Sequence, residues 1–322
     1  MDTASRTGVG RTGAYTHAAL LYDSLDELVT AAAPFVRDGL AAGEPVVLAT
    51  GARTADALLE AVDAAPGVHL VPRADTYDRR TATAITAFRR LADRFVAEGA
   101  TRIRVVGEID FGRTERDRLE WQRYEAVLNE ALSPWPISGT CVFDTQQLPA
   151  PVLAAARATH PVLATVTGYA PNPDFVEPAR YLRELPVLPE PLEETPPRLE
   201  VHGVADFIAL RHAVAAELAA VHGHRDLVDD FLLATDEMLS NAARHGRPPV
   251  DLSLWASAGT VVCRIRDRGP GFDDPFAGYG PAHGEDLSRG GMGVWLARQL
   301  CDHVDITQDT DGVTVRLTTH LR

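Results

Sequence analysis

Residues 235–246 read TDEMLSNAARHG, and two further segments follow in order, DRGPGF at 267–272 and RGGMGVWLARQLCD at 289–302. In the first segment Glu237 and Asn241 are four residues apart, and His245 extends the same helical face by another turn. A carboxylate beside a carboxamide can polarise an attacking nucleophile and hold a divalent cation. Taken alone, the pair is more often an ordinary solvated Glu/Asn pair.

The second segment closes an expected strand over 260–267. Alternation along this strand places Asp267 on the same face as Val261, Cys263 and Ile265, which points inward. An inward carboxylate at the mouth of an apolar pocket can accept hydrogen bonds from an exocyclic amine. The glycines of the segment let the backbone approach a flat ring, although a tight turn is the simpler explanation of Asp and Gly here.

The third segment, Arg289 to Gly293, opens an expected helix over 291–302. Glycines at a helix start expose backbone N–H groups, and these groups together with the helix dipole form an anion site. A single Gly-x-Gly is weak evidence by itself. The three segments together, in one order within the 57 residues from 237 to 293 and each on the element that its chemistry needs, are much more specific.

Around these segments we expect helices over 204–222 and 226–245, strands over 250–256 and 260–267, and a hairpin of 304–308 and 313–319 joined through Asp311-Gly312. Helices grouped beside an antiparallel sheet make an α+β sandwich. With its three segments, the region from about 201 to 322 resembles the GHKL ATPases, and within them the anti-sigma-factor serine/threonine kinases. The resemblance implies a GHKL (Bergerat) ATP-binding sandwich.

The resemblance also implies roles for the matching residues. Glu237 is expected as the general base, Asn241 as the ligand of Mg²⁺ and Asp267 as the reader of the adenine amine of ATP. The other expected nucleotide-binding residues shape the adenine pocket or close on the phosphates: His245, Gly269, Gly271, Arg289, Gly291, Met292 and Gly293. Residues 272–288 are expected to form the ATP lid.

The family implies transfer of phosphate to Ser or Thr of a STAS-domain anti-anti-sigma factor, with a sigma factor as the alternative partner and a homodimer as the usual state. Two alternatives stay open, a histidine kinase-like sensor and a non-catalytic module in which ATP gates partner binding. A histidine kinase needs a phospho-accepting helical hairpin, and neither His212 nor His222 lies in an H-[ED] context.

The N-terminal half alternates apolar strands with amphipathic helices. We expect strands over 18–22, 45–49, 67–71, 103–109 and 140–144, with helices over 25–42, 54–62, 82–98 and 115–132. This pattern predicts a mostly parallel α/β sheet covered on both faces. Ligands of such sheets sit beyond the carboxyl ends of the strands, which here carry Tyr22, Thr50, Glu108, Asp110 and Asp144.

Four stretches of this half, HAALLYDSLDEL, RVVGEIDFGRTERDRLEWQRYEAVLNEAL, CVFDTQQLP and ATHPVL, resemble the MEDS sensory domain. The resemblance implies a RecA-like sheet and a sensor pocket for a small-molecule ligand. The loop Thr50-Gly51-Ala52-Arg53-Thr54 lacks Gly-Lys-Thr, so nucleotide hydrolysis in this half is not expected. The candidate pocket residues are His17, Tyr22, Glu108, Trp121, Tyr124, Asp144 and His160. The separations of His17, His160 and a carboxylate give no metal signature.

Residues 171–200 hold eight of the chain's 22 prolines and seven acids against three arginines, a composition typical of a semi-rigid spacer. We therefore expect a flexible tail (1–16), a sensory domain (17–172), a linker (173–200) and an ATPase domain (201–322). The net charge of −14 argues against nucleic acid and anionic membranes as partners.

All 31 basic residues are arginine, which excludes P-loop, protein-kinase and Schiff-base lysines. The three cysteines, Cys141, Cys263 and Cys301, form no C-x-x-C pair, so neither a disulfide framework nor a zinc site is expected. The polar N-terminus and the lack of a long apolar run predict a cytoplasmic protein.

Overall fold

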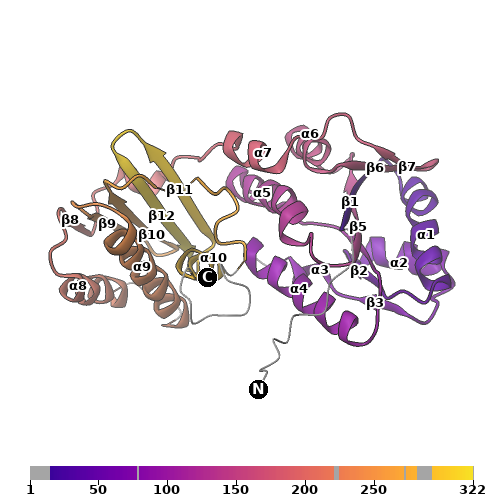
Figure 1. Cartoon of the computed structure of the whole chain (residues 1–322), viewed down its shortest axis with the longest axis horizontal. Coiled ribbons are helices and arrows are strands. Elements are labelled where there is room, and N and C mark those ends of the chain that lie inside the picture. Colours follow the sequence, from indigo (N-terminus) through magenta and orange to yellow (C-terminus); the bar gives the residue numbers. More distant parts are fainter. Residues whose placement is uncertain (1–14, 78–79, 221–224, 272, 281–291, 322) are drawn as a thin grey trace, which may run out of the picture. The chain divides into compact units, whose positions relative to one another are not determined.

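The computed structural model describes residues 15–77, 80–220, 225–271, 273–280 and 292–321. It divides into two compact units, one over residues up to 78 and 85–182, the other over 79–84 and 183–322. Each unit is built around its own sheet (Figure 1).

The first unit contains a seven-stranded sheet in the order β3-β2-β4-β5-β1-β6-β7. Its strands are β1 (Thr16–Tyr22), β2 (Val46–Ala49), β3 (Val68–Leu70), β4 (Ile103–Gly107), β5 (Ile137–Asp144), β6 (Val162–Thr165) and β7 (Gly168–Pro171). All pairs are parallel except β6 with β7. This confirms the mostly parallel α/β sheet that the alternation of apolar runs predicts.

The helices that connect the strands are α1 (Leu25–Ala41), α2 (Ala52–Ala61), α3 (Arg73–Thr76), α4 (Thr81–Ala97), α5 (Glu115–Ala131) and α6 (Ala150–Thr159), and α7 (Pro178–Glu184) follows the last strand. On one face, Leu28 and Val36 of α1 and Leu58 of α2 join Leu20 of β1 in a common core. The alternate residues of β1 and β5 face the other way, where α5 covers them. The sheet is therefore buried on both faces, which accounts for its continuous apolar strands.

The second unit is an antiparallel sheet in the order β11-β12-β10-β9-β8. Its elements are the 3₁₀ helix η1 (Pro191–Glu194), β8 (Leu199–Val201), α8 (Phe207–Ala219), α9 (Arg225–His245), β9 (Asp251–Ala256), β10 (Thr260–Asp267), α10 (Gly293–Leu300), β11 (His303–Asp309) and β12 (Gly312–His320). One core joins Val214 of α8, Met238 of α9 and Ala297 of α10 to Cys263 of β10. The predicted α+β sandwich is confirmed, with α9 and α10 lying across one face of the sheet (Figure 1).

The opposite face of this sheet is covered by residues 188–195, which we call the strap. Nε1 of Trp255 donates a hydrogen bond of 2.9 Å to the carbonyl of Thr195. Arg316 donates to the carbonyl of Leu188 at 2.6 Å and to Glu193 at 3.0 Å, and Arg264 lies 3.3 Å from the same carboxylate. The proline-rich stretch expected as a linker thus contains α7, η1 and β8 and packs on the sheet over part of its length.

The strap allows a stability prediction. Arg316 also pairs with Asp305 at 2.8 Å, and its side chain is only 10% exposed. Replacing Arg316 by Met removes the guanidinium that pairs with the largely buried carboxylates of Asp305 and Glu193, so we expect a loss of about 3 kcal/mol in the free energy of unfolding although Glu193 retains Arg264. Urea denaturation of the full chain measures it.

The matched control is Arg225→Met. Arg225 is 93% exposed and lies 4.0 Å from Asp229, so its loss should change stability by less than about 0.5 kcal/mol. Equal effects of the two substitutions would contradict the assigned role of the strap.

Candidate nucleotide-binding and sensor sites

The second unit brings Glu237, Asn241 and Gly293 together. Glu237 and Asn241 are half-buried on α9, and Gly293 is the first residue of α10. A Cβ atom added at Gly293 would lie 2.8 Å from Nδ2 of Asn241 and 3.1 Å from Oε2 of Glu237. A side chain at this position would displace the ends of the two polar side chains, so glycine lets the start of α10 approach them in the arrangement observed. Met292, the N-cap residue of α10, is half-buried and supplies no side-chain hydrogen bond to the helix start.

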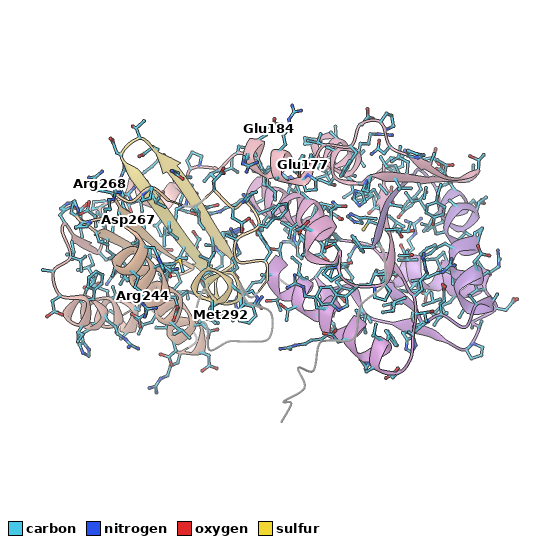
Figure 2. The ribbon with its side chains drawn as sticks, in the orientation of Figure 1. Glu177, Glu184, Arg244, Asp267, Arg268 and Met292 are labelled. Carbon is cyan, nitrogen blue, oxygen red and sulfur yellow. The ribbon has the colours of Figure 1, made fainter. Side chains whose placement is uncertain are left out.

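Asp267 ends β10 and is 8% exposed, on the inward face that alternation predicts. Its Oδ1 accepts hydrogen bonds from the backbone N–H of Gly269 at 2.6 Å and of Arg247 at 3.3 Å. Within the described part of the chain both donors go to Oδ1, which leaves Oδ2 as an acceptor for another group. Figure 2 shows Asp267 at the end of its strand and Met292 at the start of α10.

Two glycines make room for the Asp267 carboxylate. A Cβ atom at Gly269 would lie 2.7 Å from its Oδ1, and one at Gly246 would lie 2.5 Å from the same atom. Sequence reasoning predicted Gly269 as a site residue but missed Gly246. The signal was available, because Gly246 ends the segment TDEMLSNAARHG immediately after α9.

The other candidates of this unit lie in different places. His245 is exposed at the end of α9. Gly271, with φ of +70°, packs against Gln308 and Val313 of the hairpin. Arg289 and Gly291 lie outside the described residues, as do residue 272 and residues 281–288 of the expected lid.

The described part of that lid, 273–280, is held on α10. Arg298 donates a hydrogen bond of 3.0 Å to the carbonyl of Ala277 and places its guanidinium 4.3 Å from the ring centroid of the buried Tyr279. Gly278, with φ of +81°, lies against Val294. The segment that follows Asp267 is therefore anchored beside the helix that begins at Gly293.

A steric prediction follows from Gly293. Alanine at this position pushes its methyl group against Asn241 and Glu237, so we expect Mg·ATP affinity to fall by at least about tenfold, a change of 1.4 kcal/mol. Isothermal titration calorimetry on the full chain measures the affinity. Gly259→Ala is the matched control, because a Cβ atom there meets nothing within 4 Å; a weaker effect at Gly293 than at Gly259 would contradict the geometry.

In the first unit, the candidates separate into two groups. Tyr22 and Asp144 end the paired strands β1 and β5, and Glu108 directly follows β4. Burial, together with the neighbouring carboxylates of Glu108 and Asp144, raises the pKa of Tyr22 to about 12. These three side chains therefore lie near one another at the carboxyl edge of the sheet.

The carboxylate of Glu108 lies at the start of α2, where a phosphate-binding loop would hold its phosphate. Its Oε2 accepts a hydrogen bond of 2.8 Å from the backbone N–H of Gly51, the N-cap residue of α2. Arg73 pairs with Glu108 at 3.6 Å and with Asp110 at 3.9 Å. A carboxylate at this helix start repels phosphate, which agrees with the absence of Gly-Lys-Thr from the loop.

The second group lies inside the unit. The rings of His17 and His160 are 3.9 Å apart, and both side chains are at most 1% exposed. Trp121 and Tyr124 are also buried and contact each other edge-on at 5.2 Å between centroids. Burial lowers the pKa of His160 well below its usual value, and His17 lowers it further, so the imidazole is neutral at neutral pH.

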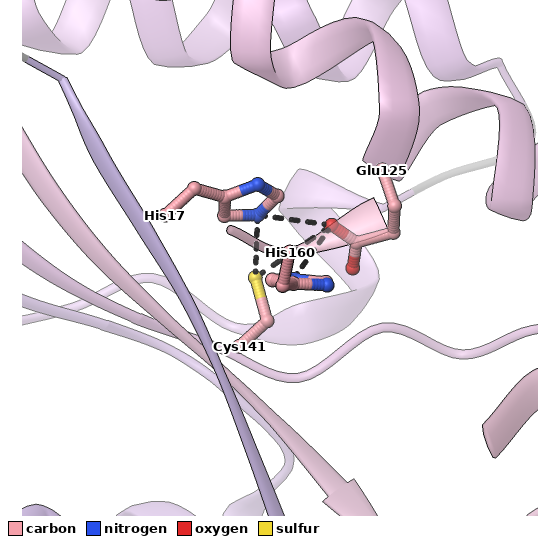
Figure 3. A group of neighbouring side chains, drawn as sticks. All are labelled: His17, Glu125, Cys141 and His160. Atoms are coloured by element: carbon pink, nitrogen blue, oxygen red, sulfur yellow. Dashed lines mark hydrogen bonds and ion pairs between the residues drawn. The ribbon is translucent and has the colours of Figure 1, made fainter. Parts of the chain in front are cut away.

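Two side chains that sequence reasoning did not select complete this second group. Glu125 of α5 and Cys141 of β5 lie with His17 and His160, and one ligand atom from each of the four falls within 4.8 Å of the others (Figure 3). The separations along the chain carry no motif, so only the packing of α5 on the sheet reveals the group.

Each of the two units matches a known protein family. Residues 16–161 match the family model described as MEDS, the methanogen/methylotroph, DcmR sensory domain. Residues 204–319 match the model of the histidine kinase-like ATPase domain. The chain therefore carries a MEDS sensory domain followed by a histidine kinase-like ATPase domain.

Among individual proteins, the chain is similar to the serine-protein kinase RsbW of Bacillus velezensis and of Bacillus subtilis. Each is 26% identical over 137 residues, which covers 38% of this chain and 84% of the relative. The sensor protein CseC of Streptomyces coelicolor is 37% identical over 84 residues, which covers 24% of this chain and only 16% of CseC.

A crystal structure of the RsbU and RsbW domains of a Mycobacterium tuberculosis protein matches with a TM-score of 0.29 and 22% identity, covering 39% of this chain and 33% of that one. In the described part of the chain, no helix is long and apolar enough to span a membrane.

Proposed function

We propose that this chain is a signal-responsive regulator of the anti-sigma-factor type, which binds Mg·ATP and phosphorylates a Ser or Thr of a STAS-domain anti-anti-sigma partner. The observation that carries the proposal is the convergence of Glu237 and Asn241 on Gly293 at the start of α10. The similarity to the serine-protein kinase RsbW supports the same class of activity. The MEDS domain supports a small-molecule ligand as the input.

The residues present fit an adenine nucleotide and a divalent cation. Asp267 offers Oδ2 to an exocyclic amine, while Gly246 and Gly269 leave space around its carboxylate. The start of α10 offers backbone N–H groups to phosphate without help from lysine. Asn241 would hold Mg²⁺, whose charge offsets that of the phosphates when it is bound.

In this proposal Glu237 performs the proton chemistry. Its carboxylate lies on the same helical face as Asn241, one turn earlier on α9. It orients the partner's hydroxyl and accepts its proton as the oxygen attacks the terminal phosphoryl group, while the bond from that phosphorus to the bridging oxygen breaks and ADP leaves. Positioning by Gly293 and by the anchored segment 273–280 brings the phosphoryl group into reach of that oxygen.

The structure of α8 favours Ser/Thr transfer over the histidine-kinase alternative. Leu210, Val214 and Leu218 of α8 are buried in the same core as α9 and the sheet. The helix α8 therefore packs within the ATPase unit. A phospho-accepting hairpin would instead need two helices that lie outside this unit and pair with those of a second copy. His212 lies on the exposed side of α8.

Transfer from radiolabelled ATP tests the proposal. The full chain is incubated with Mg·ATP and with STAS-domain proteins encoded by the same genome, and the product is treated with acid. Acid-stable phosphate on a STAS protein is the expected result. Acid-labile phosphate on this chain would replace the proposal by the histidine-kinase reading. Tight ATP binding without transfer to any of these proteins would leave the non-catalytic module as the function.

A further inference from the structure

The buried group of His17, Glu125, Cys141 and His160 forms a compact donor set that the ATPase chemistry does not use; we call it the His-Glu-Cys-His cluster. Its members come from β1, α5, β5 and the residue that follows α6. Their exposed fractions are 1%, 1%, 8% and 0%. Figure 3 shows the four side chains pointing at one another between the sheet and α5.

Four of the six distances between the donor atoms are close to the edges of a coordination tetrahedron, and all six are within 4.8 Å. Oε2 of Glu125 lies 3.2 Å from Nε2 of His17, 3.4 Å from Nε2 of His160 and 3.7 Å from Sγ of Cys141. Sγ of Cys141 lies 3.4 Å from Nε2 of His17. Metal bonds of about 2.0–2.3 Å in a tetrahedral zinc site separate the ligand atoms by about 3.3–3.6 Å.

The outer nitrogens of both imidazoles are already engaged. Nδ1 of His160 lies 2.8 Å from the carbonyl oxygen of Ala156, which can only accept, so Nδ1 carries the proton. Asn129 donates its amide N–H to the carbonyl of Thr159 at 2.9 Å, and its Oδ1 accepts from Nδ1 of His17 at 3.3 Å. With Nδ1 engaged in this way, each ring turns its Nε2 atom into the cluster, the arrangement typical of metal-binding histidines.

Two atoms in the cluster lack hydrogen bonds. Nε2 of His160 and Oε1 of Glu125 are buried and have no hydrogen-bond partner among the residues that the structure describes. The single S–H of Cys141 can serve one neighbour at a time. A carboxylate oxygen and an imidazole nitrogen left without a partner in the dry interior are costly unless a proton or a cation lies among the donor atoms.

We propose that the His-Glu-Cys-His cluster binds one transition-metal ion, and that Zn²⁺ fits it best. Two imidazoles, a carboxylate and a thiolate are ligands that zinc accepts, and oxygen-seeking Mg²⁺ or Ca²⁺ does not use thiolate. Four protein ligands close the site, so the ion joins α5 to β1 and β5. Asn129 is a positioning residue that orients His17.

Cobalt substitution tests the site. The full chain is depleted of metal with a chelator and titrated with Co²⁺, whose absorption reports tetrahedral geometry and thiolate ligation. We expect a single equivalent of Co²⁺, visible bands of a tetrahedral site, a thiolate charge-transfer band and displacement by Zn²⁺. Cys141→Ser should remove the charge-transfer band, and Cys263→Ala, which alters a buried free thiol of the other unit, should retain it.

Asn129→Ala separates ligation from mere packing. It leaves all four donor atoms in place but frees the His17 ring, so metal affinity should fall by about 10-fold with the charge-transfer band retained. Folding of each variant is checked by circular dichroism. If the Cys141→Ser protein fails to fold, X-ray absorption of the wild-type zinc form decides, with one sulfur and three nitrogen or oxygen scatterers expected.

The proposal is overturned if the folded wild-type chain takes up no Co²⁺ or Zn²⁺. It is equally overturned if the charge-transfer band survives in Cys141→Ser, or if the absorption spectrum of the zinc form contains no sulfur scatterer. In each case Cys141 is not a metal ligand, and the buried side chains are held together by hydrogen bonds alone. Because the site lies wholly in the first unit, none of these outcomes bears on phosphotransfer by the second.

Discussion

Replacing Glu237 by Gln should abolish phosphotransfer while ATP still binds. Glutamine keeps the shape of the side chain and its place beside Gly293 but cannot accept the proton of the attacking hydroxyl. General-base catalysis typically contributes about 10²–10⁴-fold, so the single-turnover transfer rate should fall by that factor. Rapid-quench measurement with saturating Mg·ATP and the acceptor STAS protein, supplied unphosphorylated, gives the rate.

Calorimetry on the same variant provides the control, since ATP affinity should stay within about threefold of the wild-type value. Asp236→Asn, at the neighbouring position on α9, alters a carboxylate that pairs with Arg211 at 2.9 Å and should leave the transfer rate unchanged. Transfer by Glu237→Gln at the wild-type rate would remove Glu237 from the chemistry and leave only a positioning role for α9.

Asp267→Asn should lower ATP affinity by at least about 100-fold and shift the preference between purines. The amide oxygen of asparagine can keep the hydrogen bonds that Oδ1 accepts from Gly269 and Arg247, so the turn survives. Its NH₂ group then replaces Oδ2 and faces the adenine amine, donor against donor. An unmade buried hydrogen bond to a charged group costs about 3 kcal/mol, which corresponds to more than 100-fold.

The shift in preference separates this role from simple damage to the site. Guanine presents an oxygen where adenine presents the amine, so the variant should lose ATP binding far more than GTP binding. Titrating both nucleotides into wild type and variant measures the ratio, and Asp311→Asn in the hairpin turn serves as the matched control. A parallel loss of both nucleotides, or equal binding of ATP and GTP by the wild type, would argue against adenine reading by Asp267.

Much of the second unit could be predicted because its signals are local. The strand over 260–267 coincides with β10, and the helix expected over 226–245 differs from α9 by one residue. Alternation along β10 was enough to place Asp267 inward. The short strand β8 was missed because its three residues follow a proline-rich stretch and become a strand only by pairing with β9.

The buried cluster of the first unit shows what local patterns cannot supply. His17 and His160 were selected as candidates, but Glu125 reads as one more polar residue of α5 and Cys141 as one apolar residue of β5. Their convergence depends on the parallel pairing of β1 with β5, which joins residues more than 100 positions apart, and on the packing of α5 against these strands. From the sequence, a ligand is expected beyond the carboxyl ends of the parallel strands, where such sheets usually bind ligands. This cluster instead lies between the sheet and α5, where that rule predicts no site.

The strap on the back of the ATPase sheet has a practical consequence for dissecting the molecule. A fragment that begins at residue 201 lacks Glu193 and the carbonyls of Leu188 and Thr195, so Trp255, Arg264 and Arg316 lose the partners that cover them. Such a fragment would expose an aromatic and cationic surface that the strap covers in the full chain. Pull-downs with it would therefore retain acidic proteins non-specifically. An isolated ATPase domain should instead start near residue 183, where the continuous part of the second compact unit begins.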